Sequence, residues 1–291
     1  MKYLLSAIAV LTFAACATPE SDPAAGDSAD ASFDAALGVQ LWSFREKASA
    51  DGPAEMLTMV RDMGLTHVET AGLYGMPADS FAAVLDEVGL EATSMHVSVE
   101  ELRNGMETVI ANAQALGVRY VGTAWYPHES PFTEETARQA AAEFNGFGRE
   151  LQAAGIRYFY HPHGYEPHPY GDETLLDLLI DETDPELVAF EMDVLWTWLP
   201  GLDPVEVIAR HPGRFKLMHI KDMKPGLGRG SLTGGLPAED QSVIGEGQVD
   251  WPTLLRAAEA DGFEHFYLED ETTDPVGNAP RSVAYLEALR N

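Results

Sequence analysis

The sequence predicts an α/β protein whose folded part, residues 34–291, is a single (β/α)8 TIM barrel. Three observations support this class: eight short apolar segments of strand type, a helix-period segment between successive strands, and their even spacing. The predicted strands are Leu37 to Phe44, His67 to Thr70, Ala92 to Val97, Tyr120 to Trp125, Tyr158 to His163, Leu187 to Val194, Phe215 to Ile220 and Phe266 to Glu269. Intervening helices favour right-handed parallel crossovers, and eight such units fit one closed barrel. A doubly wound open sheet is the alternative, but no glycine-rich dinucleotide fingerprint follows a strand.

Glycine marks the expected helix ends. A helix-period segment stops at each of Gly64, Gly89, Gly117, Gly155 and Gly262, and a strand follows. Glycine suits this place because the residue past a helix end often adopts a left-handed conformation, which costs glycine no Cβ clash. A helix start is expected at Asp203, where a capping carboxylate precedes Pro204.

Composition restricts the class of partner. The 291 residues are 45% apolar, enough for a large core, and 47 acidic against 18 basic residues give a formal net charge of -29. Nucleic-acid binding requires clustered Lys and Arg, so this balance argues against a nucleic-acid partner and favours a small-molecule one. We interpret the acidic surface as a solubility adaptation.

The N-terminus has the features of an export signal. Lys2 precedes an apolar run from Tyr3 to Phe13 that is too short to span a bilayer, and small residues lead to Cys16, the only cysteine. The run Phe13-Ala14-Ala15-Cys16 resembles the lipobox of bacterial lipoproteins. The resemblance implies a signal peptide over residues 1–15 and a lipidated Cys16, which would anchor an exported chain to a membrane on the periplasmic side. An ordinary export signal is the alternative.

A compositional change follows Cys16. Up to about Ser32 the chain is rich in Ala, Asp, Ser, Pro, Glu and Gly, without apolar periodicity. This composition predicts a disordered tether over residues 16–33.

Potential metal ligands stand at or just after the ends of the later strands. They are Glu166, Asp193, His219 and Glu269. A closed parallel barrel would bring these strand ends together at one rim. Three carboxylates and one imidazole suit Mn or Mg, with Zn at lower preference.

An ordered set of short motifs resembles a known family. The motifs are Val39-Gln40-Leu41-Trp42-Ser43, His67-Val68-Glu69, Tyr160-His161-Pro162-His163, Glu191-Met192-Asp193, His219-Ile220-Lys221-Asp222, Gly245-Glu246-Gly247 and Leu268-Glu269. Together they resemble the sugar phosphate isomerase/epimerase family, the xylose-isomerase-like TIM barrels. The resemblance implies a divalent metal held by Glu166, Asp193, His219 and Glu269. Two departures lie near Glu166: Pro162 replaces the usual Asn, and Pro167-His168-Pro169 follows.

Two of the predicted ligands are also the expected catalytic groups. Glu166 and Glu269 would flank a bound sugar, one removing a proton next to a carbonyl and the other returning it, with the metal stabilising the enediolate. Eight residues are expected to contact substrate: His96, His161, His163, Lys221, Trp42, Trp196, Arg229 and Glu246. The glycine-rich insertion between Met223 and Gln248 would act as a lid over them.

Three functions are compatible with these residues. The first is a metal-dependent isomerase or epimerase of a sugar or keto-sugar. The second is a lyase or hydratase that uses the same metal site on oxidised (keto) glycosides. The third is a non-catalytic sugar-binding lipoprotein.

Overall fold

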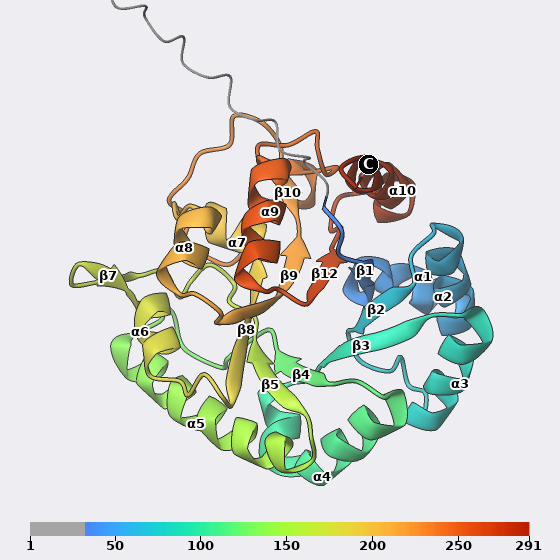
Figure 1. Cartoon of the computed structure of the whole chain (residues 1–291), viewed down its shortest axis with the longest axis horizontal. Helices are drawn as coiled ribbons and strands as arrows, with labels where there is room; N and C mark the ends of the chain where they lie inside the picture. Colours follow the sequence, from blue (N-terminus) through green and yellow to red (C-terminus); the bar gives the residue numbers. More distant parts are fainter. Residues whose placement is uncertain (1–32, 291) are drawn as a thin grey trace, which may run out of the picture. The chain divides into compact units, whose positions relative to one another are not determined.

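The computed structural model describes residues 33–290 and shows a closed barrel of eight parallel strands (Figure 1). The strands are β1 (Leu37–Gln40), β2 (His67–Thr70), β3 (Glu91–His96), β4 (Tyr120–Thr123), β5 (Arg157–Tyr160), β8 (Val188–Asp193), β9 (Phe215–Ile220) and β12 (His265–Leu268). Their order around the barrel is β1-β12-β9-β8-β5-β4-β3-β2. The predicted barrel class is confirmed.

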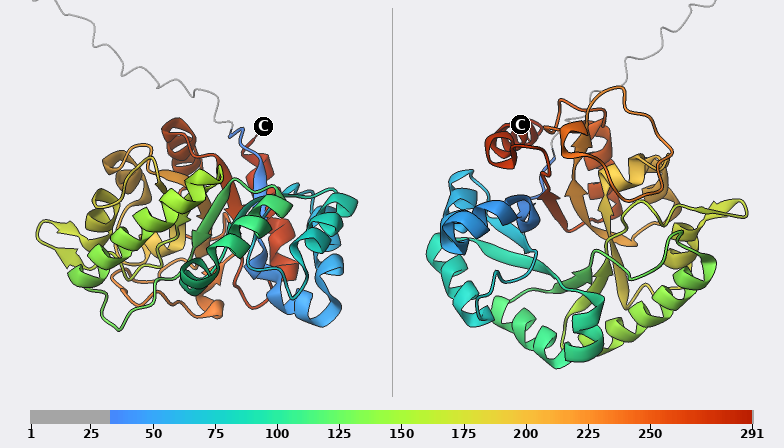
Figure 2. Two further views of the ribbon diagram at one scale, coloured as in Figure 1. Left: turned by 90° about the horizontal axis from the view of Figure 1, so that it is seen from below. Right: turned by 180° about the vertical axis from the view of Figure 1, so that it is seen from behind.

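Helices surround the barrel, as both further views show (Figure 2). They are α1 (Arg45–Asp51), α2 (Pro53–Asp62), α3 (Ala78–Val88), α4 (Val99–Leu116), α5 (Glu134–Ala153), α6 (Leu175–Asp181), α7 (Val194–Trp198), α8 (Pro204–Arg210), α9 (Trp251–Asp261) and α10 (Pro275–Ala288), with 3-10 turns η1 (Leu41–Phe44) and η2 (Ala238–Asp240). Two antiparallel ribbons pair β6 (Pro169–Tyr170) with β7 (Glu173–Thr174) and β10 (Asp222–Met223) with β11 (Gln241–Ser242).

The predicted helix boundaries are confirmed where glycine or aspartate marks them. Gly89, Gly117 and Gly262 are left-handed C-caps of α3, α4 and α9. Asp203 caps α8, where its side chain accepts a hydrogen bond from Val205 N at 2.8 Å. The first predicted strand is too long, because the Gln40 side chain accepts a hydrogen bond from Trp42 N and a 3-10 turn begins at Leu41.

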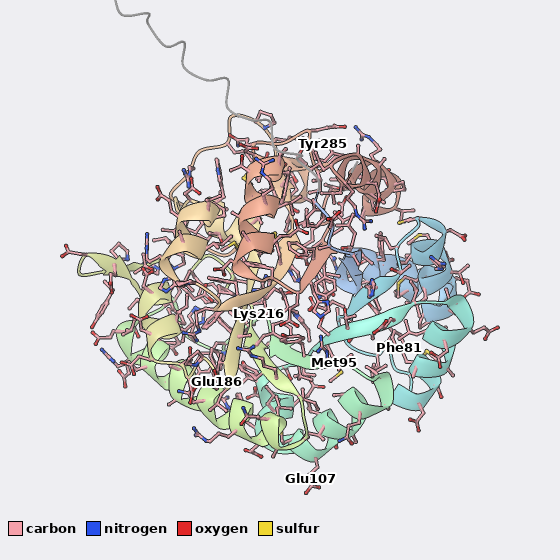
Figure 3. The ribbon with its side chains drawn as sticks, in the orientation of Figure 1. Phe81, Met95, Glu107, Glu186, Lys216 and Tyr285 are labelled. Atoms are coloured by element: carbon pink, nitrogen blue, oxygen red, sulfur yellow. The ribbon has the colours of Figure 1, made fainter. Side chains whose placement is uncertain are left out.

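Two of the buried hydrophobic clusters belong to the barrel itself. The larger lies between the strands and the helices, where Phe81 of α3 and Met95 of β3 are buried, whereas Glu107 of α4 projects outward (Figure 3). The smaller cluster comprises Tyr120, Phe159, Ala189, Leu217 and Tyr267, one residue from each of five neighbouring strands. Residues at spacing two along a strand share a face, so the members of this cluster identify which side chains point into the barrel.

The chain enters the barrel at Phe33. Its backbone N donates to Leu289 O at 3.2 Å and its ring packs edge-on against Phe266, with 5.0 Å between ring centroids. Phe33 therefore belongs to the barrel, one residue earlier than the predicted boundary. The predicted signal peptide, Cys16 and the rest of the predicted tether lie outside the described residues. Between residues 33 and 290, no helix combines the length and apolar character that a membrane span requires.

Candidate active site and metal centre

The polar side chains of the site continue the inward-facing register of the strands. On β8, Glu191 and Asp193 follow Ala189 at spacing two, and His219 follows Leu217 on β9. His161 directly follows β5 and stands two residues after Phe159. The apolar cluster thus closes the barrel interior below, and imidazoles and carboxylates occupy the layers above it, toward the carboxyl ends of the strands.

The rim group consists of His161, Asp193, His219 and Glu269. His161 Nε2 lies 3.5 Å from Asp193 Oδ2, and His219 Nδ1 lies 3.9 Å from Asp193 Oδ2 and 3.2 Å from Glu269 Oε2. All four residues are buried. Among the described residues, His161 Nε2, Asp193 Oδ2 and His219 Nδ1 have no hydrogen-bond partner.

These atoms fit a bound cation. Buried polar atoms are normally hydrogen-bonded, so three neighbouring buried atoms without a hydrogen-bond partner indicate a site for a bound group. Ligands at about 2.0–2.2 Å from a tetrahedral ion would stand about 3.3–3.6 Å from one another. The separations within the rim group span this range, and the ligand atoms of His161, Asp193 and His219 all lie within 4.8 Å of one another.

Lys221 sits beside the rim group. Its Nζ lies 3.0 Å from Glu269 Oε2 and 3.8 Å from Asp193 Oδ2, and it also pairs with Glu271. Burial alone would lower the pKa of Lys221, but the carboxylates of Glu269 and Asp193 raise it above its ordinary value. Lys221 is therefore a buried cation at neutral pH.

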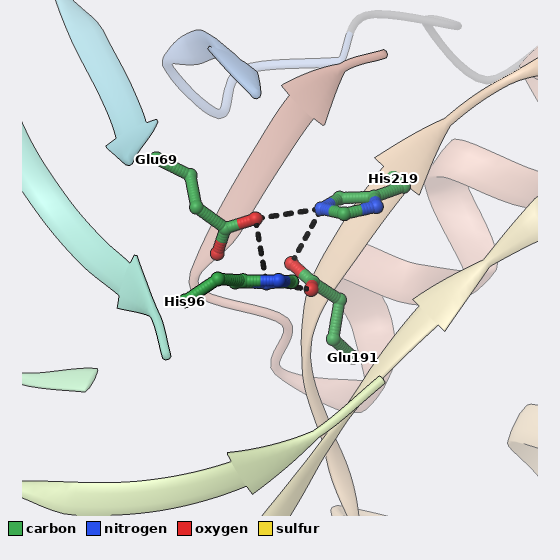
Figure 4. A group of neighbouring side chains, drawn as sticks. All are labelled: Glu69, His96, Glu191 and His219. Carbon is green, nitrogen blue, oxygen red and sulfur yellow. Dashed lines mark hydrogen bonds and ion pairs between the residues drawn. The ribbon is translucent and has the colours of Figure 1, made fainter. Parts of the chain in front are cut away.

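The inner group consists of Glu69, His96, Glu191 and His219 (Figure 4). Glu69 Oε1 is 2.7 Å from His219 Nε2 and 3.0 Å from His96 Nε2, which in turn is 2.9 Å from Glu191 Oε2. Burial alone would raise the pKa of Glu69, but the two imidazoles hold it well below its usual range. Burial opposes the charge on His96, yet Glu69 and Glu191 raise its pKa to about 9.

A cavity of about 980 Å³ opens above these groups. His96, His161, His163, His219, Lys221 and Glu269 line it, together with Trp42, Trp125 and Trp196. Among the described side chains, the exposed large apolar ones are Trp42, Trp125 and Val276, so two of the three stand on this cavity. The tryptophans offer flat apolar surfaces to a ligand.

The predicted lid segment contributes to the wall of the cavity. Gly234, Gly235 and Leu236 line it, and Gly234 packs so closely that a Cβ there would stand 2.8 Å from His163 O. Arg229 is held elsewhere, because it donates to the backbone oxygens of Trp198 and Leu202 and stacks on the Trp198 ring. Glu246 pairs with Arg281. Neither Arg229 nor Glu246 is among the described residues that line the cavity.

The structure does not bring Glu166 to the rim group. Its carboxylate accepts hydrogen bonds from Tyr160 OH at 2.6 Å and from His163 N at 3.0 Å. Tyr160 alternates with the inward-facing Phe159 and His161, and it packs in the core between strands and helices. Glu166 thus faces the helix side of β5. Burial raises its pKa to about 7.

Of the other predicted site residues, most lie where the sequence suggested. Asp193, His219 and Glu269 come together, and Trp42, His96, His163, Trp196 and Lys221 line the cavity. Sequence reasoning assigned His161 to substrate and missed Glu69 and Glu191. The available signal was the spacing of two, which gives Glu191 the register of Asp193 and His161 the register of Phe159.

Comparisons with known proteins agree with this architecture. The inosose dehydratase of Geobacillus thermodenitrificans (strain NG80-2) is 24% identical over 179 residues, which cover 59% of this chain and 59% of the relative. The chain thus spans about three fifths of the length of the curated relatives that it matches first.

Solved structures share the fold. A crystal structure of a sugar phosphate isomerase/epimerase from Parabacteroides distasonis ATCC 8503 matches with a TM-score of 0.71 and 24% identity, covering 93% of this chain and 98% of that one. The IolI protein with a bound zinc atom matches with a TM-score of 0.63 and 15% identity, covering 87% and 96%. The family model described as the xylose isomerase-like TIM barrel matches residues 33–289, and the chain therefore belongs to that family.

Proposed function

We propose that this protein is a divalent-metal-dependent enzyme that transfers a proton next to the carbonyl of a sugar or keto-sugar. The carrying observation is the rim group, in which three buried ligand atoms converge without hydrogen-bond partners among the described residues. A glycoside is a suitable substrate, because the cavity volume is near the upper end of the ~300–1,000 Å³ typical of ligand pockets and tryptophans stand on its wall.

The proposed ligands are His161, Asp193, His219 and Glu269. His161 takes the role that the sequence suggested for Glu166. Two imidazoles and two carboxylates favour Zn or Mn over Mg, which prefers an all-oxygen shell. When bound, such an ion would supply Lewis-acid polarisation of the substrate carbonyl.

The chain's own groups would handle the proton. The carboxylate of Glu269 faces the cavity, and although burial would raise its pKa, Lys221 and His219 hold that pKa well below the usual range. It is therefore ionised, the form that a general base requires, although its basicity is low. Lys221, 3.0 Å away, would stabilise negative charge that develops on the substrate oxygen. Burial lowers the pKa of His163 to about 3, so this imidazole is neutral and would hydrogen-bond a substrate hydroxyl.

The simplest outcome is isomerisation or epimerisation. Elimination is the second candidate, and the similarity to inosose dehydratases favours it, because dehydration of a polyhydroxy ketone begins with the same proton transfer. The two outcomes differ only in whether a leaving group departs from the neighbouring carbon.

Exchange in heavy water tests the proposal. The protein reconstituted with Mn or Zn would be incubated in D2O with ketoses, inososes and oxidised methyl glycosides, and products followed by NMR and mass spectrometry. We expect deuterium next to the carbonyl, with a changed stereocentre or a lost leaving group deciding between the candidates. Metal-stripped protein and Glu269→Gln should show neither. Sugar binding that survives Glu269→Gln, without exchange by the parent protein, would instead favour the non-catalytic sugar-binding function.

We also propose that the protein is exported and lipid-anchored through Cys16. The sequence of residues 3–16 supports this. Cys16→Ser should move the protein from the membrane fraction to the soluble one, and membrane association unchanged by this substitution would contradict the anchor.

A further inference from the structure

His219 is approached by carboxylates at both of its ring nitrogens. Nε2 lies 2.7 Å from Glu69 Oε1 and 3.1 Å from Glu191 Oε1, whereas Nδ1 faces Glu269 and Asp193 in the rim group. A neutral imidazole carries one N–H, and the nitrogen that keeps it cannot bind a cation. The hydrogen bond at one nitrogen therefore decides whether the other is available as a ligand.

Of the two carboxylates at His219 Nε2, Glu69 accepts more hydrogen bonds from neighbouring side chains. Its Oε1 accepts from Gln40 Nε2 at 2.6 Å, and its Oε2 accepts from Ser94 Oγ at 2.5 Å. Ser94 Oγ in turn lies 2.8 Å from Tyr267 OH. The two strands beside β2, β1 and β3, thus supply the donors that fix Glu69, and Tyr267 of β12 contacts Ser94 in turn.

The backbone also contributes to this arrangement. The pairing of β2 with β3 shifts register between Val68 and Glu69, and the pairing of β8 with β9 shifts between Phe190 and Glu191. Such irregularities re-aim side chains, and in this barrel both fall at an inner-group carboxylate.

We propose that Glu69 is a positioning residue that keeps the N–H of His219 on Nε2 and so presents the Nδ1 lone pair to the metal. Glu191 and His96 complete the group, with His96 Nε2 between the two carboxylates. This inference rests on the proposed metal site. The contacts within and around the inner group are 2.5–3.1 Å long, which are hydrogen-bond lengths. The inner group is therefore assigned to orienting His219 as a metal ligand.

A second metal ion is the competing assignment. The ligand atoms of the inner group lie within 4.8 Å of one another, and among the described atoms Glu191 Oε1 has no hydrogen-bond partner. The two assignments predict different stoichiometry: one ion per chain if the inner group only positions His219, and two if it binds metal itself.

Glu69→Gln tests the proposal, because it preserves the size of the side chain but removes its charge. Zn and Mn affinity would be measured by competition with a chelator, with metal content per chain as a second readout. We expect one ion per chain in the parent protein and an affinity about 10–100-fold weaker in the variant, the usual effect of losing an outer carboxylate partner. Glu166→Gln makes the same chemical change at another buried carboxylate and should leave affinity unchanged.

Nitrogen-15 NMR of the imidazoles supplies a readout independent of metal binding. In metal-free protein, burial opposes the charge on the imidazole, but carboxylates at both ring nitrogens raise the pKa of His219 well above its ordinary value, so we expect a proton on each nitrogen. Glu69→Gln should move the Nε2 resonance more than the Nδ1 resonance, because it removes the charged acceptor at Nε2. A folded Glu69→Gln variant with unchanged metal affinity and unchanged imidazole shifts would overturn the proposal. A parent protein with two ions, one of which Glu69→Gln loses, would overturn it in favour of a second metal site. If the parent protein bound no metal but the imidazole shifts responded as expected, the proposed function would fail while the positioning role stood.

Discussion

The rim group and the inner group each contain two imidazoles and two carboxylates and share His219, yet they differ in how closely their members approach one another. In the inner group, carboxylate oxygens lie 2.7–3.1 Å from imidazole Nε2 atoms. In the rim group the corresponding separations are 3.2–3.9 Å. The first set is within hydrogen-bond length and most of the second is beyond it.

If the proposed metal site is correct, the difference separates the charged groups that hold the site together from those that bind the ion. At hydrogen-bond distance, as between Glu69 Oε1 and the Nε2 atoms of His219 and His96, a buried carboxylate and an imidazole satisfy each other and leave little for a cation. Slightly farther apart, as at Asp193 Oδ2 and His161 Nε2, they keep lone pairs that a cation would use. Composition alone does not distinguish the groups; the depth of each side chain along its strand does.

Replacing Asp193 should reduce metal affinity more than any other substitution proposed for these two groups. Asp193 Oδ1 accepts from Trp196 N at 2.9 Å as the N-cap of α7, and Asn is an equally good cap. Asp193→Asn therefore preserves the helix start but weakens the rim-group ligand. We expect metal affinity to fall by more than about 100-fold, beyond the ~10–100-fold of an outer-partner change. Chelator competition measures it, with thermal unfolding as the check on folding.

The outcome that would contradict this assignment is stoichiometric metal in folded Asp193→Asn at unchanged affinity. His161→Ala sharpens the same test, because His161 has no hydrogen-bond partner in the described part of the chain. Its loss should weaken metal binding without disrupting a hydrogen-bond network.

Replacing Lys221 should reverse the sign of the effect on metal affinity. Lys221 compensates the negative charge of Glu269 and Asp193 in the metal-free protein. Lys221→Met leaves these buried carboxylates unpaired, which should lower the unfolding free energy by roughly 3–5 kcal/mol. A divalent ion would no longer compete with a neighbouring cation. We expect lower stability without metal, tighter metal binding, and a larger rise in melting temperature on metal addition than in the parent protein.

Calorimetry with and without Zn or Mn measures both parts of that expectation. Weaker metal binding by Lys221→Met would show that the ammonium group supports the ion rather than competing with it. Unchanged metal-free stability would show that solvent or protonation compensates the carboxylates in its absence.

Much of the fold was predictable because its determinants are local. Apolar segments such as those around Val68 and Val121 alternate with helix-period stretches, and glycine ends the helices at Gly89 and Gly117. The first predicted strand was too long. It ends where the Gln40 side chain accepts a hydrogen bond from Trp42 N and a 3-10 turn begins, and the pattern of apolar residues does not indicate this contact.

The position of a proposed ligand was predictable where that residue lies on a strand or directly after it. Asp193, His219 and Glu269 meet this condition and come together. Glu166 stands six residues after the last residue of β5, where the spacing of two no longer fixes direction, and its side chain turns to Tyr160. The pairing of Glu69 with His219 depends on residues 150 positions apart, which sequence spacing does not relate.

Glu166 belongs to neither the rim group nor the inner group. Glu166→Gln should therefore have the smallest effect on metal binding, less than about twofold.

The effect of Glu166→Gln on stability should instead depend on pH. Burial raises its pKa from the ordinary 4.5 to about 7, so the folded protein keeps a proton that the unfolded chain loses, and unfolding free energy falls as pH rises through this window. At ~1.4 kcal/mol per pH unit, the ionised form costs roughly 3 kcal/mol. Glu166→Gln lacks this titration. Its unfolding free energy, relative to that of the parent protein, should therefore increase by a similar amount from pH 5 to pH 8. Denaturant unfolding at both values measures it, and a metal affinity that falls as in Asp193→Asn would restore Glu166 to the ligand set.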